Sequence, residues 1–422
     1  MRPLSPQANF RMKKNLTLVL ALLAGGLLTG AAHAAAAPHE TPVPVAAADY
    51  VSAETIDGAG LVLDPLAEPD GASLRFSGTG PRGRFDLSGR ENLAAYAAML
   101  RAIAELGKMD REKMFGRAAG QAAKAPVEAA AKLVTDPAKT LSALPKGAMN
   151  FLKRTGRQIK ENSRQIAEGS ANSTAASDLI GLGSIKRQLA VSLGVDPYLP
   201  DETFQNALNE TASAAYFGGI GVKALTMLVA PVAVSQVVTG LNISGNLAKK
   251  IVSSSAADLR ASDREDLSSL GVPPDTIAAL FANRWFTPAS TTVLVDALKQ
   301  LGTKKGIPRF VAACAGVEDS TDATYYREVA ALLARRVAAQ GPLARLEMFH
   351  ALPVAVSQQN ELVVPLPADL LWWTPTADEI SQALLQGEGA RPTGAELWTD
   401  GQLTPMAAAA LRERGYTIST VD

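Results

Sequence analysis

The sequence predicts an α+β fold that is predominantly helical, with a helical centre between two units that contain strands. Three observations indicate this class. Alanine is abundant while aromatic residues make up only 5% of the chain, which favours helices packed closely through small side chains. Short apolar runs separated by glycine-rich turns lie in the first hundred residues. Strand and helix patterns alternate after residue 345.

The chain opens with the pattern of a secretory signal peptide. Basic residues precede an apolar run from Leu16 to Leu28, and the motif Ala32-His33-Ala34 follows it. The run is shorter than the ~20 apolar residues of a bilayer span. We therefore expect residues 1–34 to be a leader that is cleaved after Ala34, which exports the mature chain to the periplasm or beyond.

Two alternatives at the N-terminus stay open. The short apolar run could be an uncleaved anchor, although no stop-transfer charges follow it. Met12 is as plausible a start as Met1, because it places two lysines directly before the run. After the cleavage site, residues 35–49 are rich in alanine and proline and predict a disordered linker.

A small α+β unit is predicted for residues 50–108. Strand patterns lie at Gly60–Leu63, Ala72–Phe76 and Arg84–Leu87, and Ser77–Gly83 predicts the turn between the last two.

A long amphipathic helix follows these strands. Ser88 and Glu91 fit a capping box, in which each side chain satisfies a free amide at the helix start. Apolar residues then recur at three-to-four spacing from Leu93 to Leu106. This spacing predicts a helix that packs on one face of the sheet, so Leu100 is expected in a core.

Residues 109–345 are predicted to form a helical domain. Signals for helix starts stand at Asp136-Pro137, Asp201–Thr203, Gly271–Asp275 and Thr287-Pro288, where a capping side chain or proline occupies the first turn.

Residues 346–422 are predicted to form a small α/β unit. A hairpin joins the apolar runs Leu352–Val356 and Leu362–Leu366, and Leu370–Trp373 could add a strand. The order strand, helix, strand, helix, strand that follows favours a sheet that is partly parallel. Its expected helices and strands are Asp378–Leu385, Glu396–Trp398, Thr404–Arg414 and Tyr416–Val421.

Segments in three regions of the chain resemble known sequences. They are Gly89–Leu93 with Ile103–Leu106, then Val134–Pro137 with Pro145–Gly147 and Phe151–Arg154, and finally Leu193–Tyr198. Through them the chain resembles a group of exported proteobacterial proteins of unknown function. The group carries no assigned activity, so the resemblance implies no catalytic residues.

Composition argues against several classes of function. The 41 basic residues balance the 41 acidic ones, so overall charge recruits neither nucleic acid nor an anionic membrane. Cys314 is the single cysteine, which excludes an internal disulfide, and its apolar neighbours predict a buried inert thiol.

Histidine is scarce as well. His39 falls in the predicted linker, which leaves His350 as the one imidazole of the folded sequence. A Ser–His–Asp system or a zinc site is therefore poorly supported. No metal and no cofactor is predicted.

Carboxylate chemistry is the catalytic alternative. Asp369 precedes Trp372 and Trp373, and Glu396 and Asp400 flank Trp398. Tryptophans beside acids could form a sugar platform for a glycan hydrolase. The competing interpretation is that the tryptophans are core and rim anchors of the C-terminal sheet.

Two further segments could contact partners. Lys153, Arg157, Lys160 and Arg164 share one helix face that could bind an anionic lipid surface or an envelope protein, or could simply be solvated. The apolar segment 222–238 could associate with a membrane, but Lys223, Pro231 and Gln236 interrupt it, which favours a buried helix.

The function expected from the sequence is non-catalytic binding or scaffolding in the cell envelope. The first alternative is a carboxylate-dependent envelope hydrolase that acts on glycans. The second is a membrane-associated protein that uses residues 222–238. Neither the partner nor the ligand follows from the sequence.

Overall fold

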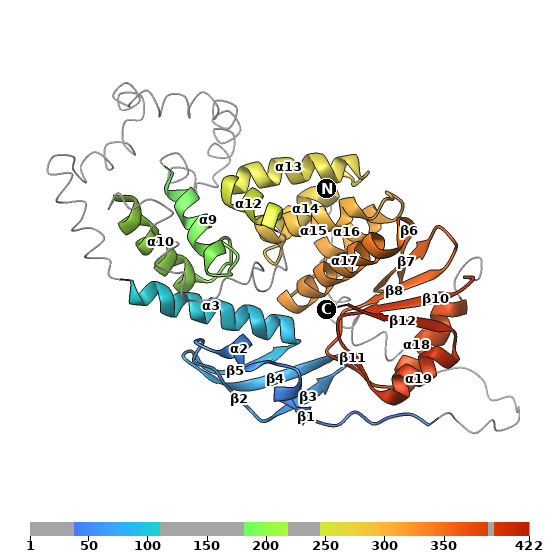
Figure 1. The fold of residues 1–422 in the computed structure, drawn as a ribbon. Coiled ribbons are helices and arrows are strands. Elements are labelled where there is room, and N and C mark those ends of the chain that lie inside the picture. Colours follow the sequence, from blue (N-terminus) through green and yellow to red (C-terminus); the bar gives the residue numbers. More distant parts are fainter. Residues whose placement is uncertain (1–37, 110–180, 218–244, 387–391, 422) are drawn as a thin grey trace, which may run out of the picture.

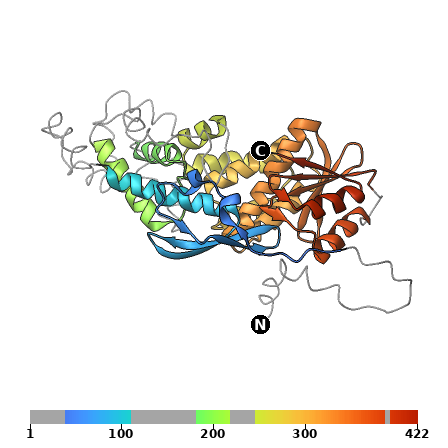
Figure 2. The same ribbon diagram turned by 60° about the horizontal axis from the view of Figure 1, so that its bottom comes forward.

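The computed structural model describes residues 38–109, 181–217, 245–386 and 392–421 (Figure 1). Within them the α+β class with predominant helix is confirmed. The small N-terminal sheet and its long helix lie low in Figure 1, where the end of this sheet meets the C-terminal unit, and the helices from the middle of the chain lie above them (Figures 1 and 2).

The N-terminal sheet is antiparallel and built around β4. This strand pairs with β5 along one edge, and with β3 and then β2 along the other, while β1 continues the sheet beyond β3. The elements of this unit are β1 (Val45–Ala46), η1 (Ala47–Asp49), α2 (Ala53–Ile56), β2 (Val62–Leu63), β3 (Leu66–Asp70), β4 (Ser73–Gly80), β5 (Gly83–Ser88) and α3 (Arg90–Lys108).

The predicted hairpin is present, but the predicted turn at Ser77–Gly83 was too long. Strand β4 continues to Gly80, and Pro81 and Arg82 alone connect it to β5. Gly78 lies in the strand because the backbone of the neighbouring strand β2 approaches it closely. A Cβ on Gly78 would stand 2.2 Å from the Val62 carbonyl oxygen. Glycine in a strand often marks such a close approach of backbone.

The predicted disorder of residues 35–49 was wrong for residues 38–49. β1 pairs with β3 there. The Glu40 carboxylate accepts hydrogen bonds from the Trp373 backbone amide at 2.6 Å and from Thr404 Oγ1 at 2.5 Å. Contacts to the distant C-terminal unit thus order an Ala/Pro-rich segment that has no apolar pattern of its own.

The first described helices of the centre pack on the N-terminal unit. They are α9 (Leu182–Ser192) and α10 (Glu202–Phe217), and their apolar residues join those of α3 and the first sheet in one hydrophobic cluster. Leu100 lies in this cluster and is 5% exposed. The predicted start at Asp201 is confirmed, because its Oδ1 accepts from the Phe204 amide at 2.8 Å. The cluster therefore crosses the boundary predicted between residues 108 and 109.

The remaining central helices form a compact layer beside the second sheet (Figure 1). The predicted start at Thr287 is confirmed by the hydrogen bond that its hydroxyl accepts from the Ser290 amide. The helices are α12 (Gly245–Ser253), α13 (Ala256–Ser269), α14 (Pro274–Ala282), α15 (Pro288–Gln300), α16 (Ile307–Ala315) and α17 (Ser320–Gln340).

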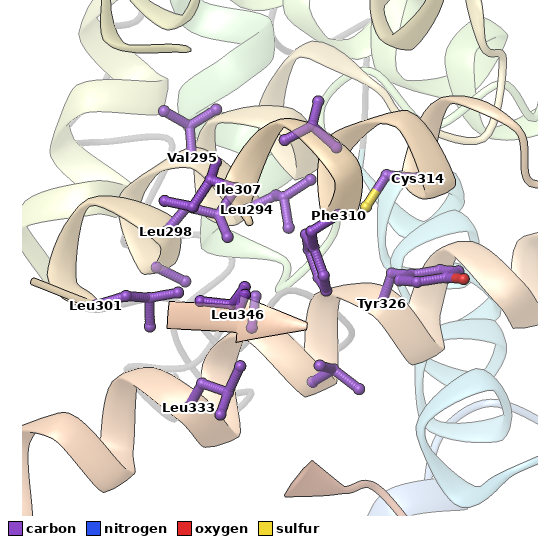
Figure 3. Packing of buried hydrophobic residues seen from close by; sticks show 14 of the residues in the cluster. Leu294, Val295, Leu298, Leu301, Ile307, Phe310, Cys314, Tyr326, Leu333 and Leu346 are labelled. Carbon is purple, nitrogen blue, oxygen red and sulfur yellow. The ribbon is translucent and has the colours of Figure 1, made fainter. Parts of the chain in front are cut away.

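The centre of this layer is apolar. Phe310 and Leu333 meet Leu346 of the sheet in the core that Figure 3 shows, and Cys314 lies in the same cluster. Cys314 is 0% exposed and burial raises the pKa of its thiol, so the prediction of a buried cysteine is confirmed.

The C-terminal sheet has the order β12-β10-β8-β7-β6. β8, β10 and β12 are parallel, while β6 and β7 complete an antiparallel edge, so the partly parallel sheet is confirmed. The elements are β6 (Leu343–Phe349), β7 (Leu352–Ser357), β8 (Leu362–Leu366), β9 (Leu370–Leu371), α18 (Pro375–Gln386), β10 (Ala395–Thr399), β11 (Gln402–Leu403), α19 (Pro405–Glu413) and β12 (Tyr416–Thr420).

Both faces of this sheet are covered. Trp398 packs with the central helices, whereas its neighbour Leu397 packs with Leu384 of α18 and Leu411 of α19. Successive residues of a strand point to opposite faces, so β10 is buried on both sides. Parallel strands that are connected by helices normally show this burial.

Candidate functional site

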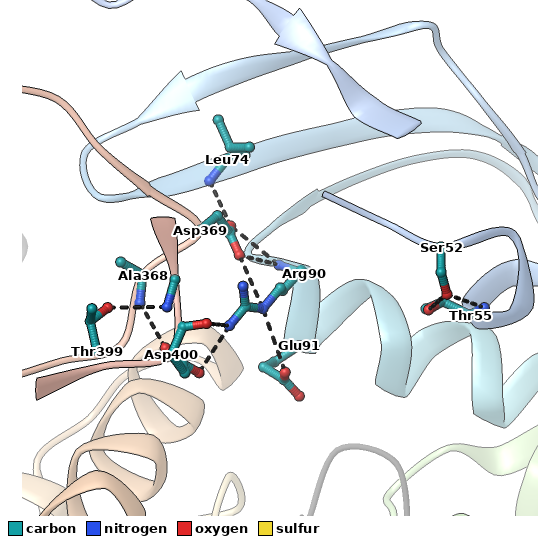
Figure 4. Close-up of polar contacts among 10 residues, drawn as sticks. Ser52, Thr55, Leu74, Arg90, Glu91, Ala368, Asp369, Thr399 and Asp400 are labelled. Atoms are coloured by element: carbon teal, nitrogen blue, oxygen red, sulfur yellow. Dashed lines mark hydrogen bonds and ion pairs between the residues drawn. The ribbon is translucent and has the colours of Figure 1, made fainter. Parts of the chain in front are cut away.

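Two of the predicted acids lie where the parallel strands end. Asp369 follows β8 and Asp400 directly follows β10, and the register pairs Leu366 with Thr399 at these ends. In open α/β sheets, the carboxyl ends of parallel strands are the usual place for a ligand site. In this chain both side chains meet Arg90, the first residue of α3 (Figure 4).

Asp369 holds the start of α3. Its carboxylate accepts from the Leu74 amide at 2.8 Å and from the Arg90 amide at 3.2 Å, and Arg90 Nε lies 3.8 Å away. The residue is 3% exposed. Burial raises the pKa of the Asp369 carboxyl, and the two amides act in the opposite direction.

The capping box predicted at Ser88 and Glu91 was wrong. The N-cap is Gly89, at φ 85°, and it has no side chain to accept from the first turn. Asp369 supplies that acceptor from the other end of the chain instead (Figure 4).

Asp400 ties the same helix to the next strand end. Arg90 Nη2 donates to the Asp400 carbonyl oxygen at 2.6 Å and lies 3.1 Å from Oδ2, while Oδ1 accepts from the Ala368 amide at 3.3 Å. The loops are tightly packed here, since a Cβ on Gly401 would stand 2.0 Å from the Ala368 carbonyl oxygen.

Glu396, the third predicted acid, has a different environment. It pairs with Arg336 of α17 through Nη2–Oε1 at 2.7 Å and Nε–Oε2 at 3.2 Å, and Trp398 Nε1 donates to Oε2 at 2.8 Å. Both members of this ion pair are buried. The structure therefore brings Asp369 and Asp400 together and places Glu396 in a separate contact between sheet and helix.

The tryptophans act as core anchors. Trp373 and Trp398 are 2% and 4% exposed, and Trp372 packs against the N-terminal hydrophobic cluster. A sugar platform needs an exposed aromatic face, which Trp373 and Trp398 do not offer, while Trp372 is half-buried.

A pocket of about 60 Å³ lies where the three parts of the chain meet, and we name it the joint pocket. The start of α3, the first half of α17 and the loops after β8 and β10 line it. Its charged lining residues are Arg90, Glu91, Glu328, Asp369 and Asp400.

Sequence reasoning missed three of these residues. Glu91 was predicted only as part of a capping box, Arg90 was given no role, and Glu328 lies in the middle of the long helix α17. The one local signal was that the apolar residues Val329 and Ala330 directly follow Glu328, and that signal does not identify a partner.

Glu328 has the most perturbed environment of the pocket. It is 8% exposed, and burial raises the pKa of its carboxyl to about 7, with a further contribution from Glu91 and an opposing one from Arg327. Burial also raises the pKa of Glu91. Perturbed carboxyls in a shared pocket are typical of functional sites, although structural networks also produce them.

The two histidines considered in the sequence lie away from the joint pocket. His39, predicted to lie in a disordered linker, belongs to the ordered residues and meets Asp378 at 2.8 Å, while His350 lies in the turn between β6 and β7 at φ 53°. Within the described ranges, no three His, Cys, Asp or Glu side chains could jointly hold a metal ion. No helix in those ranges has the length and apolar character to cross a bilayer.

Several predicted features fall outside the described residues, among them the helix start at Asp136-Pro137 and two segments that could contact partners. The two segments are the basic face of Lys153, Arg157, Lys160 and Arg164, and the apolar segment 222–238. All of these stay predictions, as does the leader 1–34.

Comparisons with protein-family models, with characterised proteins and with solved structures found no match to this chain. The resemblance to exported proteobacterial proteins therefore also stays a prediction.

Proposed function

We propose that the chain is an exported protein of the cell envelope whose role is binding or scaffolding rather than catalysis. The observation that carries this proposal is the use of two candidate catalytic carboxylates in internal contacts. Asp369 caps α3 and Glu396 pairs with Arg336, and the two acids are only 3% and 7% exposed. A general acid or nucleophile must reach its substrate.

The joint around Arg90 supports a scaffolding role. One arginine connects the N-terminal unit to the ends of two strands of the C-terminal sheet. Thr324 of α17 donates to Asn92 Oδ1 of α3 at 3.0 Å, which adds the central helices to the same joint. Contacts of this kind hold the three parts in fixed relative positions, as a binding surface requires.

The export part of the proposal rests on the leader pattern. Residues 35–37 alone separate the proposed cleavage point from the first described residue. Cleavage after Ala34 would keep His39 and Glu40, whose contacts order the mature N-terminus. Removal of the leader is therefore compatible with every contact described above.

The second candidate is a carboxylate-dependent glycan hydrolase that uses the joint pocket. One observation favours it: Glu328, with a pKa near 7, shares the pocket with Asp400. Glycoside hydrolysis commonly uses two carboxyl groups in contrasting environments. The size of the pocket opposes it, since about 60 Å³ is far below the roughly 300–1,000 Å³ of a typical ligand site.

Two measurements separate these functions. Mature chain is incubated with envelope glycan fragments at millimolar concentration, and in parallel it is used to capture partners from envelope extracts. Binding or scaffolding predicts reproducible retention of a partner and no released sugar ends. Glycan cleavage that disappears in both Glu328→Gln and Asp400→Asn would overturn the proposal in favour of the hydrolase.

The export step has its own test. Residues 1–34 are fused to a reporter enzyme that is active only outside the cytoplasm, with Ala32 and Ala34 replaced by aspartate as the processing control. We expect activity with cleavage for the natural leader and unprocessed fusion for the control. A reporter that stays inactive in the cytoplasm would contradict export.

A further inference from the structure

We propose that the joint pocket binds the primary ammonium group of a small amine. The inference deepens the proposed binding role and rests on it, by naming a ligand class and the residues that hold it. Glu328 is the principal acceptor, with Glu91 and Asp400 as its acidic neighbours.

Charge is the first argument. Four carboxyl groups line the pocket, namely Glu91, Glu328, Asp369 and Asp400, whereas Arg90 is the one cationic lining residue in the described part of the chain. Arg90 is already engaged by the two aspartates. Arg327 and Arg335 of the same helix act on the charge of Glu328 without lining the pocket, yet the pKa of Glu328 stays raised. Because buried charge that is incompletely compensated is costly, a cation that enters the pocket lowers the free energy of the group.

The second argument is an acid without a partner. Glu328 is 8% exposed and lines the pocket, and among the described residues its carboxyl has no hydrogen bond or ion pair, although Arg327 and Arg335 of the same helix act on its charge. Asp369 differs, because the Leu74 and Arg90 amides satisfy it. Buried polar groups are nearly always paired in native proteins, so an unpaired carboxyl that lines a pocket indicates a missing donor.

The size and chemistry of the pocket select the kind of cation. A buried water needs roughly 10–15 Å³, so about 60 Å³ accommodates a methylammonium-sized group or a few waters. No three acidic or other metal-ligating side chains in the described ranges converge as a metal requires. A primary ammonium has three N–H donors, and the hydroxyls of Ser73 and Thr321, which also line the pocket, can accept beside Glu328.

The test is a calorimetric titration of the mature chain with methylammonium chloride at pH 8 and constant ionic strength. Potassium chloride and tetramethylammonium chloride are the control cations, since neither has an N–H donor. We expect saturable binding of methylammonium in the millimolar range and at least tenfold weaker binding of both controls. Equal binding of potassium, or no binding of methylammonium up to 100 mM, would overturn the proposal.

Variants assign the binding to the pocket. Glu328→Gln is expected to weaken methylammonium at least tenfold, while Glu318→Gln, an exposed acid just before the same helix, should leave it unchanged. Glu91→Gln provides a second variant, with an expected weakening of several-fold. Unchanged affinity in Glu328→Gln would place any binding elsewhere and overturn the proposal.

The pH dependence adds an independent readout. Protonation of Glu328 removes the charge that attracts the ammonium, and the charged groups that face it are Glu91, Arg327, Arg335 and Asp400. We expect methylammonium to bind about tenfold more weakly at pH 6 than at pH 8, from competition with one proton. A flat profile would contradict the role of Glu328.

Two sources of the ammonium group are distinguished by probe. Nα-acetyl-lysinamide presents a lysine side chain, whereas methylammonium represents a free amine. Tighter binding of the lysine probe indicates a protein lysine, and tighter binding of methylammonium indicates a free metabolite. A chain that binds neither probe but still retains an envelope partner would remove the amine inference and leave the proposed binding role intact.

Discussion

Replacement of Asp369 by alanine tests the joint between the two ends of the chain. The carboxylate is 3% exposed and accepts from the Leu74 and Arg90 amides. A buried amide that loses its acceptor costs about 1–3 kcal/mol, and a lost helix cap about 0.5–2 kcal/mol. Because the Arg90 amide is also the capped group, these terms overlap. Two amides lose their acceptor and the cap is not counted a second time, so we expect Asp369→Ala to lower the free energy of unfolding by about 2–6 kcal/mol.

The assay is urea unfolding of the mature chain, followed by circular dichroism and by tryptophan fluorescence. Asp369→Asn keeps an acceptor oxygen and loses the charge, so about 1–2 kcal/mol is expected. Asp86→Ala is the matched control, since its carboxylate is exposed and lies 3.9 Å from Arg75, and less than about 0.5 kcal/mol is expected. If Asp369→Ala costs no more than Asp86→Ala, the reasoning about the joint is refuted.

Three further predictions concern stability. Arg336→Met leaves the Glu396 carboxylate buried without its ion-pair partner, so the free energy of unfolding in urea should fall by about 3–5 kcal/mol. The double variant with Glu396→Leu should recover at least half of this loss. No recovery would contradict the ion-pair account. Burial raises the pKa of Glu328 from 4.5 to about 7, so the folded chain holds a proton that the unfolded chain releases, and stability falls as pH rises between these values. Glu328→Gln should therefore stabilise the chain by about 2–3 kcal/mol at pH 8 and have little effect at pH 4, and the same effect at both pH values would count against this. Gly401→Ala should destabilise the chain by more than about 2 kcal/mol, because its Cβ would stand 2.0 Å from the Ala368 carbonyl oxygen. Gly107→Ala should stabilise it by about 0.5–1 kcal/mol, because nothing lies within 4 Å of a Cβ at this helical position. Thermal melting of both variants tests these expectations.

Local signals predicted much of the fold. The starts of the helices at Asp201 and Thr287 were readable because the capping side chain and the capped amide are three residues apart. β6 was missed because its apolar residues do not alternate. A register shift between Leu343 and Arg345 interrupts the period of two on which strand prediction depends.

The candidate site was only partly predictable. Asp369 and Asp400 could be chosen as unusual acids, but the amide and guanidinium of Arg90 that they bind lie 279 and 310 residues away along the chain. The order of the segment around Glu40 depends on Trp373, which is 333 residues away. Contacts at such separations leave no periodic trace in a single sequence, so the role of Asp369 as a cap and the joint pocket itself could not be foreseen.

The intact mass of the chain recovered from the envelope fraction tests the central proposal most directly. If the chain is an exported binding protein, the main species should have the mass of residues 35–422, and the full-length chain should be a minor precursor. Recovery of the uncleaved chain in the cytoplasm as the main species would contradict the account.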